Sequence, residues 1–205
     1  MTILLCTSLR PSPRTRTFCN DLVAVAVEFE YYVRGKTSLL LLSAHAHSSG
    51  ADRLWIVSSR FGDPKLIECF DTTGPKPRQL LSLLMNKVIL IRELKVAQKR
   101  MLEKERSQSE DSDAPDYGDD RGRAPTQGGR RGHLSLRTPA GRSFSELHDC
   151  LLDSLGPLSY NRVPGEPETN LVVSPCKDCL AELTFVDSKS GALCGPKIML
   201  RDYRF

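Results

Sequence analysis

The first 37 residues alternate between short apolar runs and a helical pattern, and this alternation constrains the fold more than any other feature. Residues 3–6 form an apolar run, and residues 30–33 have the composition of a strand. Between them, Phe18, Leu22 and Val25 are spaced to share one face of a helix. A strand, a helix and a second strand in succession predict an α/β fold.

The rest of the first half continues the alternation. Thr37 or Ser38 is suited to cap a second helix, which we expect to be largely buried and to end near Gly50. Residues 53–58 contain a continuous apolar run, as in a strand of a sheet covered on both faces. A turn at 61–64 and a returning strand at 65–70 complete a β-α-β-α-β-β order.

The second half has a similar mixture of helical and strand patterns. One expected helix is inward-facing at Leu94, Ala97, Met101 and Leu102, and another starts at a capping box formed by Ser143 and Glu146. The expected helices are 77–84, 94–106 and a third running to 155, with Phe144, Leu147, Leu151 and Leu155 on one face; the expected strands are 88–91, 133–137, 171–173, 179–186 and 194–200, with a loop at 160–169 and a turn at 188–191.

The segment 107–132 differs from the rest of the chain. Its first part is rich in acids, its second part is rich in glycine and arginine, and it has no large aliphatic residue. Such a segment has little to bury, so we expect a disordered internal insertion. It is interpreted as a tolerated loop, with an arginine-rich RNA tether as the alternative.

The totals limit the class of protein. A chain of 205 residues forms one or at most two domains. Its net charge is only +4, but its 19 arginines outnumber its 10 lysines, and the arginine side chain is suited to phosphates. The seven cysteines without a secretory signal predict reduced thiols in a cytoplasmic protein. The longest apolar-rich segment, 80–91, is too short to span a bilayer, so no membrane association is expected.

No motif supports an enzyme, a cofactor or a small-molecule substrate. Gly35-Lys36-Thr37 resembles the end of a P-loop, but Glu30 stands where that motif requires glycine. Cys176 and Cys179 form a single C-x-x-C pair, whereas a closed zinc site needs four ligands. Cys150 and Cys194 could complete such a site only if the fold brought them together. The pair is therefore interpreted as packed or free thiols with no metal. The histidines form no ligand pattern: His45, His47, His133 and His148.

Two basic turns are the candidate functional feature. Ser12 is a good N-cap and Pro13 suits the first helical position, yet Arg14 and Arg16 lie in the first turn, where the helix dipole opposes positive charge. Their placement is favourable if an anion binds there; the alternative is a solvated turn. If the strands at 3–7 and 31–34 are parallel, both basic turns lie at one edge. The candidate phosphate-binding residues are Arg10, Arg14, Arg16, Arg34, Lys36 and Arg60.

Several of these segments, in this order, resemble the N-terminal signature of Brix-domain proteins. The matching segments are Leu4-Leu5-Cys6-Thr7-Ser8, Arg10-Pro11-Ser12, Thr15-Arg16-Thr17-Phe18, Arg34-Gly35-Lys36, Ala51-Asp52-Arg53 before the apolar run 54–57, and Gly62-Asp63-Pro64 before 66–70. The likeness is specific over residues 3–71 and weaker over 86–96 and 170–203. The length of the chain resembles the archaeal single-domain members.

This resemblance implies one Brix-like domain over residues 1–205, made of two similar α/β halves at 1–71 and 86–205. It implies a fold related to the anticodon-binding domain of class II aminoacyl-tRNA synthetases. The implied function is non-catalytic binding of ribosomal RNA precursors in ribosome biogenesis, with ribosomal or assembly proteins as further partners. The implied location is cytoplasmic, or nucleolar if the source is eukaryotic. Two alternatives remain: a tRNA-binding accessory module, and a protein–protein adaptor in an assembly complex.

Overall fold

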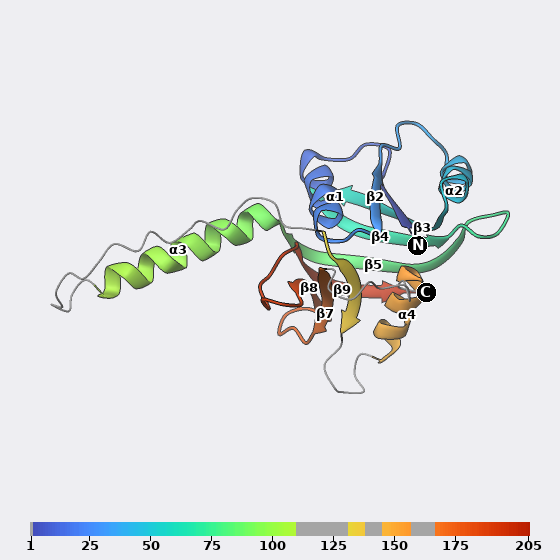
Figure 1. Ribbon diagram of the computed structural model, residues 1–205. Coiled ribbons are helices and arrows are strands. Elements are labelled where there is room, and N and C mark those ends of the chain that lie inside the picture. Colours follow the sequence, from blue (N-terminus) through green and yellow to red (C-terminus); the bar gives the residue numbers. More distant parts are fainter. Residues whose placement is uncertain (1, 110–130, 138–144, 157–166) are drawn as a thin grey trace.

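The computed structural model describes residues 2–109, 131–137, 145–156 and 167–205 (Figure 1). These residues form a mixed α/β structure built on one nine-stranded sheet. In sheet order the strands are β2 (Phe29–Tyr32), β1 (Thr2–Thr7), β3 (Ala51–Arg60), β4 (Asp63–Asp71), β5 (Arg78–Ile89), β9 (Lys197–Arg204), β8 (Ala181–Asp187), β7 (Glu168–Ser174) and β6 (His133–Arg137). The helices are α1 (Pro13–Val25), α2 (Leu39–Ser48), α3 (Ile91–Ser109) and α4 (Ser145–Leu155).

The pairing pattern on one side of the sheet is repeated on the other. Strand β1 is parallel to β3, and β3, β4 and β5 follow as an antiparallel meander. Strand β6 is likewise parallel to β7, and β7, β8 and β9 follow as an antiparallel meander. Strands β5 and β9 pair at the centre and join the two sets. Strand β2, parallel to β1, is an addition to the first set.

Helix α1 forms as its sequence predicts. The Ser12 side chain accepts a hydrogen bond from the Thr15 backbone N–H at 3.1 Å, which satisfies one donor that the helix itself leaves unpaired. Pro13 occupies the first turn, where its missing N–H costs nothing. Phe18, Leu22 and Val25 are all buried on the face that packs on the sheet.

Two cores cover the two faces of the sheet. The larger core contains α1, α4 and strands of both sets, and Leu147, Leu151 and Leu155 give α4 its buried face, as predicted. Helix α4 also contacts the first set of strands, because the Trp55 indole N–H of β3 donates to the Ser154 carbonyl at 3.2 Å. The smaller core lies under α2 on the opposite face, centred on Leu42.

The prediction that α2 is largely buried is wrong. Leu42 and Ala46 are buried, but Leu40 and Leu41 are 57% and 62% exposed. The helix packs on the sheet through one stripe only, so a run of four leucines cannot place all its members inside. Ser38 caps it by accepting from the Leu41 N–H at 3.3 Å, as expected.

The expected short helix at 77–84 and separate strand at 88–91 are also wrong. Residues 78–89 form the single strand β5. Leu81, Leu83 and Met85 alternate into the larger core, and antiparallel partners on both sides, β4 and β9, fix this extended conformation.

The helix expected at 94–106 is present as α3. Most of the face that was expected to be buried is exposed. Ala97 is exposed, and Met101 and Leu102 are 65% and 59% exposed, because α3 projects away from the sheet (Figure 1).

The expected insertion, the loop at 160–169 and the cap of α4 overlap only partly with the described residues. Residues 107–109 belong to α3, and Gly132 forms a bridge with Ala26, so the predicted boundaries of the insertion are wrong at both ends. Residues 110–130 lie outside the described residues, as do Ser143 and Phe144 of the proposed cap. The loop expected at 160–169 is described only from 167, and 168–169 already belong to β7.

The segment 25–28, which leads into β2, contacts the strand at the opposite end of the sheet. The Val27 N–H donates to the Gly132 carbonyl at 3.1 Å. The Glu28 carboxylate, which is 5% exposed, accepts from the Leu134 backbone N–H at 3.1 Å and lies 3.2 Å from His133 Nδ1. Strand β6 is therefore tied to the start of β2, and the sheet bends back on itself around the larger core.

Candidate nucleic-acid interface

The carboxyl ends of three neighbouring parallel strands, β2, β1 and β3, lie at one edge of the sheet. In register, Cys6 lies beside Tyr32 of β2 and Thr7 beside Val57 of β3. Arg10, Arg34 and Lys36 lie in the segments that follow β1 and β2, and Arg60 is the last residue of β3; we call these four residues the basic edge. The parallel pairing that places both basic turns together is the one expected from sequence.

Two helix starts lie at this edge of the sheet, one on each of its faces. The chain enters α1 directly after β1 and α2 directly after β2, and the caps Ser12 and Ser38 hold both first turns. The amino end of a helix carries a partial positive charge and unpaired N–H groups. The basic edge thus combines cationic side chains with two helix amino ends, an arrangement that favours phosphate.

Arg34 is held by hydrogen bonds to its own turn. Its Nε donates to the Thr37 carbonyl at 3.0 Å, and the Thr37 N–H donates back to the Arg34 carbonyl at 3.1 Å. Its charge also acts on the end of β1: burial raises the pKa of the Cys6 thiol to about 12, and Arg34 partly opposes that rise. Arg34 is half-buried, while Arg10, Lys36 and Arg60 are exposed.

Arg16 is exposed on α1. Burial raises the pKa of the Tyr31 hydroxyl, and the nearby positive charge of Arg16 is among the effects that lower it. Arg16 therefore adds a fifth cation at the rim of the basic edge.

Arg14 does not behave like the other candidates. Its guanidinium donates to both carboxylate oxygens of Glu93 and, through Nη2, to the Val88 carbonyl at 2.9 Å. Its Nε lies 3.0 Å from Asp63 Oδ1, close enough for an ion pair although the direction of the N–H is unsuitable for a hydrogen bond. The hydrogen bond with Glu93 raises the pKa of Arg14 and lowers that of Glu93. Arg14 joins α1 to the β5–α3 junction, and the two carboxylates on its guanidinium give this cluster a net negative charge, which disfavours phosphate.

The sequence analysis did not single out Phe61. This side chain is 92% exposed at the tip of the β3–β4 hairpin, and the Arg60 guanidinium lies 5.2 Å from the centre of its ring. Leu9 and Val33, which lie just after β1 and β2 in the chain, are 58% and 73% exposed. The signal available in the sequence was an aromatic residue directly before glycine in a predicted turn, where burial is not expected.

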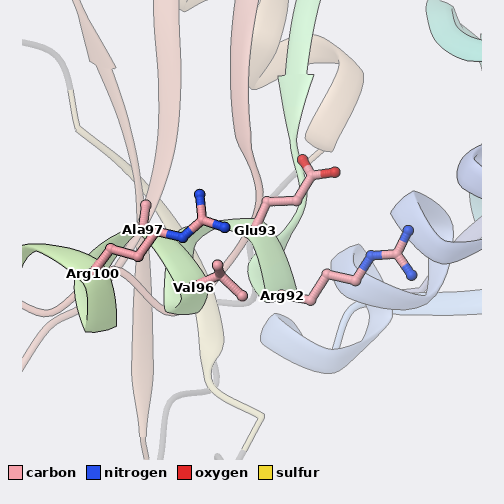
Figure 2. A pocket seen from close by; sticks show the side chains of 5 residues that line it. All are labelled: Arg92, Glu93, Val96, Ala97 and Arg100. Atoms are coloured by element: carbon pink, nitrogen blue, oxygen red, sulfur yellow. The ribbon is translucent and has the colours of Figure 1, made fainter.

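A hollow lies on α3, next to the Arg14–Glu93 bridge. It has a volume of about 420 Å³ and is lined by Arg92, Glu93, Val96, Ala97 and Arg100 (Figure 2). Arg92 extends toward α1, where Asp21 accepts a hydrogen bond from the Ile91 N–H at 2.9 Å. Burial raises the pKa of Asp21, and Arg92 partly opposes this. The start of α3 is therefore fixed to α1 by two side-chain contacts.

The cysteines differ from the sequence interpretation. Cys176 and Cys179 form a disulfide, with their Cα atoms 5.2 Å apart, so they are neither packed nor free thiols. The turn before β8 brings the two Cα atoms within the distance that a disulfide can span. The expectation of reduced thiols did not take this turn into account. Within the described ranges, no group of three His, Cys, Asp or Glu residues could hold a metal ion. No helix there is long and apolar enough to cross a membrane.

Comparison with curated proteins confirms the resemblance to Brix-domain proteins. Over 88 residues, 42% of the chain, it is 39% identical to a probable Brix domain-containing ribosomal biogenesis protein of Aeropyrum pernix. Over 88 residues, 43% of the chain, it is 36% identical to a protein of the same description from Methanopyrus kandleri. The matches span 49% and 46% of those proteins, so the chain covers about half the length of the curated relatives. No family model matches.

Solved structures extend the likeness to the whole fold. A probable ribosomal biogenesis protein from Aeropyrum pernix K1 superposes with a TM-score of 0.71 and 25% identity over 98% of this chain and 96% of its own. Mil, an archaeal Imp4-like protein, superposes with a TM-score of 0.59 and 20% identity over 98% of both chains, which shows a shared fold.

Proposed function

We propose that this protein is a non-catalytic factor of ribosome biogenesis that binds ribosomal RNA precursors through its basic edge. The observation that carries the proposal is the placement of four cationic side chains and two capped helix starts at one edge of the sheet, where β1, β2 and β3 have their carboxyl ends. The names of the curated relatives support a role in ribosome biogenesis, and the basic edge supports RNA as the ligand.

The proposal includes the remaining expectations that the resemblance implies. Residues 1–205 form one Brix-like domain with a fold related to the anticodon-binding domain of class II aminoacyl-tRNA synthetases. The repeated pairing pattern on either side of β5 and β9 supports two similar halves. Ribosomal and assembly proteins are further partners, and the site of action is the cytoplasm, or the nucleolus in a eukaryote.

The salt dependence of RNA binding tests the basic edge. Arg10→Ala with Lys36→Ala removes two exposed charges, so the slope of log K against log salt should fall by up to about 1.8 for duplex contacts and somewhat less for single strands. The matched control is Arg201→Ala with Arg204→Ala, which removes equal charge from β9, a strand outside the basic edge. Equal losses in the two double variants would mean that only bulk charge matters and that the basic edge is not the site.

The RNA that co-purifies with the full chain separates the alternatives. Ribosomal precursor RNA, identified by crosslinking in cells and sequencing, is the expected result. Enrichment of tRNA would favour the accessory tRNA-binding module. Absence of RNA, together with co-purifying assembly proteins, would favour the adaptor and refute the proposal.

A further inference from the structure

The tip of the β3–β4 hairpin holds an aromatic ring in solvent at a backbone cost. Phe61 has a φ of 53° and is 92% exposed. This left-handed conformation is unfavourable for a bulky L-residue, and glycine would adopt it freely. The ring obtains almost no burial in return, so folding alone does not explain phenylalanine at this position.

One face of the ring is occupied by a cation. The Arg60 guanidinium lies 5.2 Å from the ring centroid, within the range of a cation–π contact. The guanidinium holds positive charge beside the ring, while the high exposure of Phe61 leaves ring surface for another flat group.

The hairpin tip lies beside the basic edge. Asp63, which pairs with Arg60 across the hairpin, is also 3.0 Å from Arg14 in the first turn of α1, so the tip is tied to the segment that carries Arg10. Arg14 shares its charge between Asp63 and Glu93, so it offsets the negative charge of Asp63 only in part. A ligand on Phe61 would meet cations, and Leu9 and Val33 add exposed apolar surface along the same strand ends.

We infer that Phe61 is a stacking platform for an unpaired RNA base, whose flanking phosphates lie on the basic edge. The inference rests on the proposed function and narrows it to a class of RNA. A nucleobase has a flat apolar face, and its backbone is anionic, which matches a bare ring among cations. Bases inside a duplex are already stacked on their neighbours, so the platform selects single-stranded or looped RNA.

The test compares a short unpaired RNA, carrying one 2-aminopurine, with the same strand annealed to its complement. Phe61→Ala should weaken binding of the unpaired strand by roughly 5- to 150-fold, the range for one base–aromatic stack. Its effect on the duplex should stay within about twofold. Phe61→Tyr retains the ring and should bind as the wild type does. Quenching of 2-aminopurine on binding should be present with phenylalanine or tyrosine and absent with alanine.

Phe205→Ala is the matched control, because Phe205 is 82% exposed at the end of the chain, beyond β9. Phe205→Ala should leave both affinities unchanged. If it weakened binding of the unpaired RNA as much as Phe61→Ala does, the inference would be overturned. If the wild type and Phe61→Ala bound both RNAs equally well, the stacking platform would be refuted and the proposed function would stand. A wild type that binds neither RNA would refute the proposed function as well. Thermal unfolding of each variant separates binding losses from misfolding.

Discussion

Glu28 should be the side chain whose loss most weakens the closure between the two ends of the sheet. Its carboxylate is 5% exposed and accepts from the Leu134 N–H through both oxygens, each at 3.1 Å. Glu28→Ala leaves a buried N–H without this acceptor, which costs about 1–3 kcal/mol, with the upper part of the range expected because the acceptor is charged. His133, 3.2 Å away, loses a contact in the same step.

The expected destabilisation by Glu28→Ala is therefore about 2–3 kcal/mol. For a chain of 205 residues this lowers the thermal midpoint by roughly 4–12 °C. Glu28→Gln keeps an amide oxygen for the Leu134 N–H, so its cost should be about 1 kcal/mol. Urea unfolding measures both differences, and hydrogen exchange should show faster opening of β6 before the rest of the sheet.

Glu103→Ala is the control, since this glutamate is exposed on α3 and makes a surface ion pair with Lys99 at 3.7 Å. Its effect should stay within about 0.5 kcal/mol. If Glu28→Ala is as mild as Glu103→Ala, water satisfies the Leu134 N–H and Glu28 does not hold the junction. Glu28→Gln being as harmful as Glu28→Ala would show that charge, rather than the acceptor, holds the junction.

Three further predictions concern single residues. Gly132→Ala should cost about 1–3 kcal/mol in urea unfolding, because a Cβ there would lie 2.9 Å from two backbone atoms of 168–169; Gly74→Ala, where the nearest atom is 3.7 Å away, should be harmless. Phe61→Gly should raise stability by about 0.5–1 kcal/mol by relieving a φ of 53°, and a loss would show that the ring is structural. Arg14 lowers the pKa of Glu93, so the ion pair contributes fully to the free energy of unfolding above the ordinary glutamate pKa of 4.5, and this contribution is lost as pH falls through the lower pKa of the folded state. Glu93→Gln should remove that part of the acid dependence of the thermal midpoint.

The elements that the sequence predicts correctly are those set by local chemistry. The Ser12 cap, the turn before β4 and the buried face of α4 depend on residues close together in the chain. Strand β5 could not be predicted in the same way. Leu80 and Leu84 flank the alternating Leu81 and Leu83, so the run fits a helix as well as a strand, and only the partners β4 and β9 decide.

The errors at α2 and α3 have a common cause. Apolar residues at helical spacing indicate which face of a helix could be buried, but not whether another element covers it. At α2 the sheet covers one stripe, and at α3 no described strand covers Met101 or Leu102. Likewise, Phe61 is prominent only once its exposure and its positive φ are known.

Arg14 shows why charge patterns locate a site better than they assign its members. The sequence places Arg14 and Arg16 together, against the helix dipole, and treats them alike. In the structure, tertiary contacts bring Glu93 from 79 residues away onto Arg14 and leave Arg16 exposed. Replacing both would therefore mix a loss of stability with a loss of charge. Arg10 and Lys36, which are exposed at the ends of two neighbouring strands, are the pair whose removal tests phosphate binding without disturbing the fold.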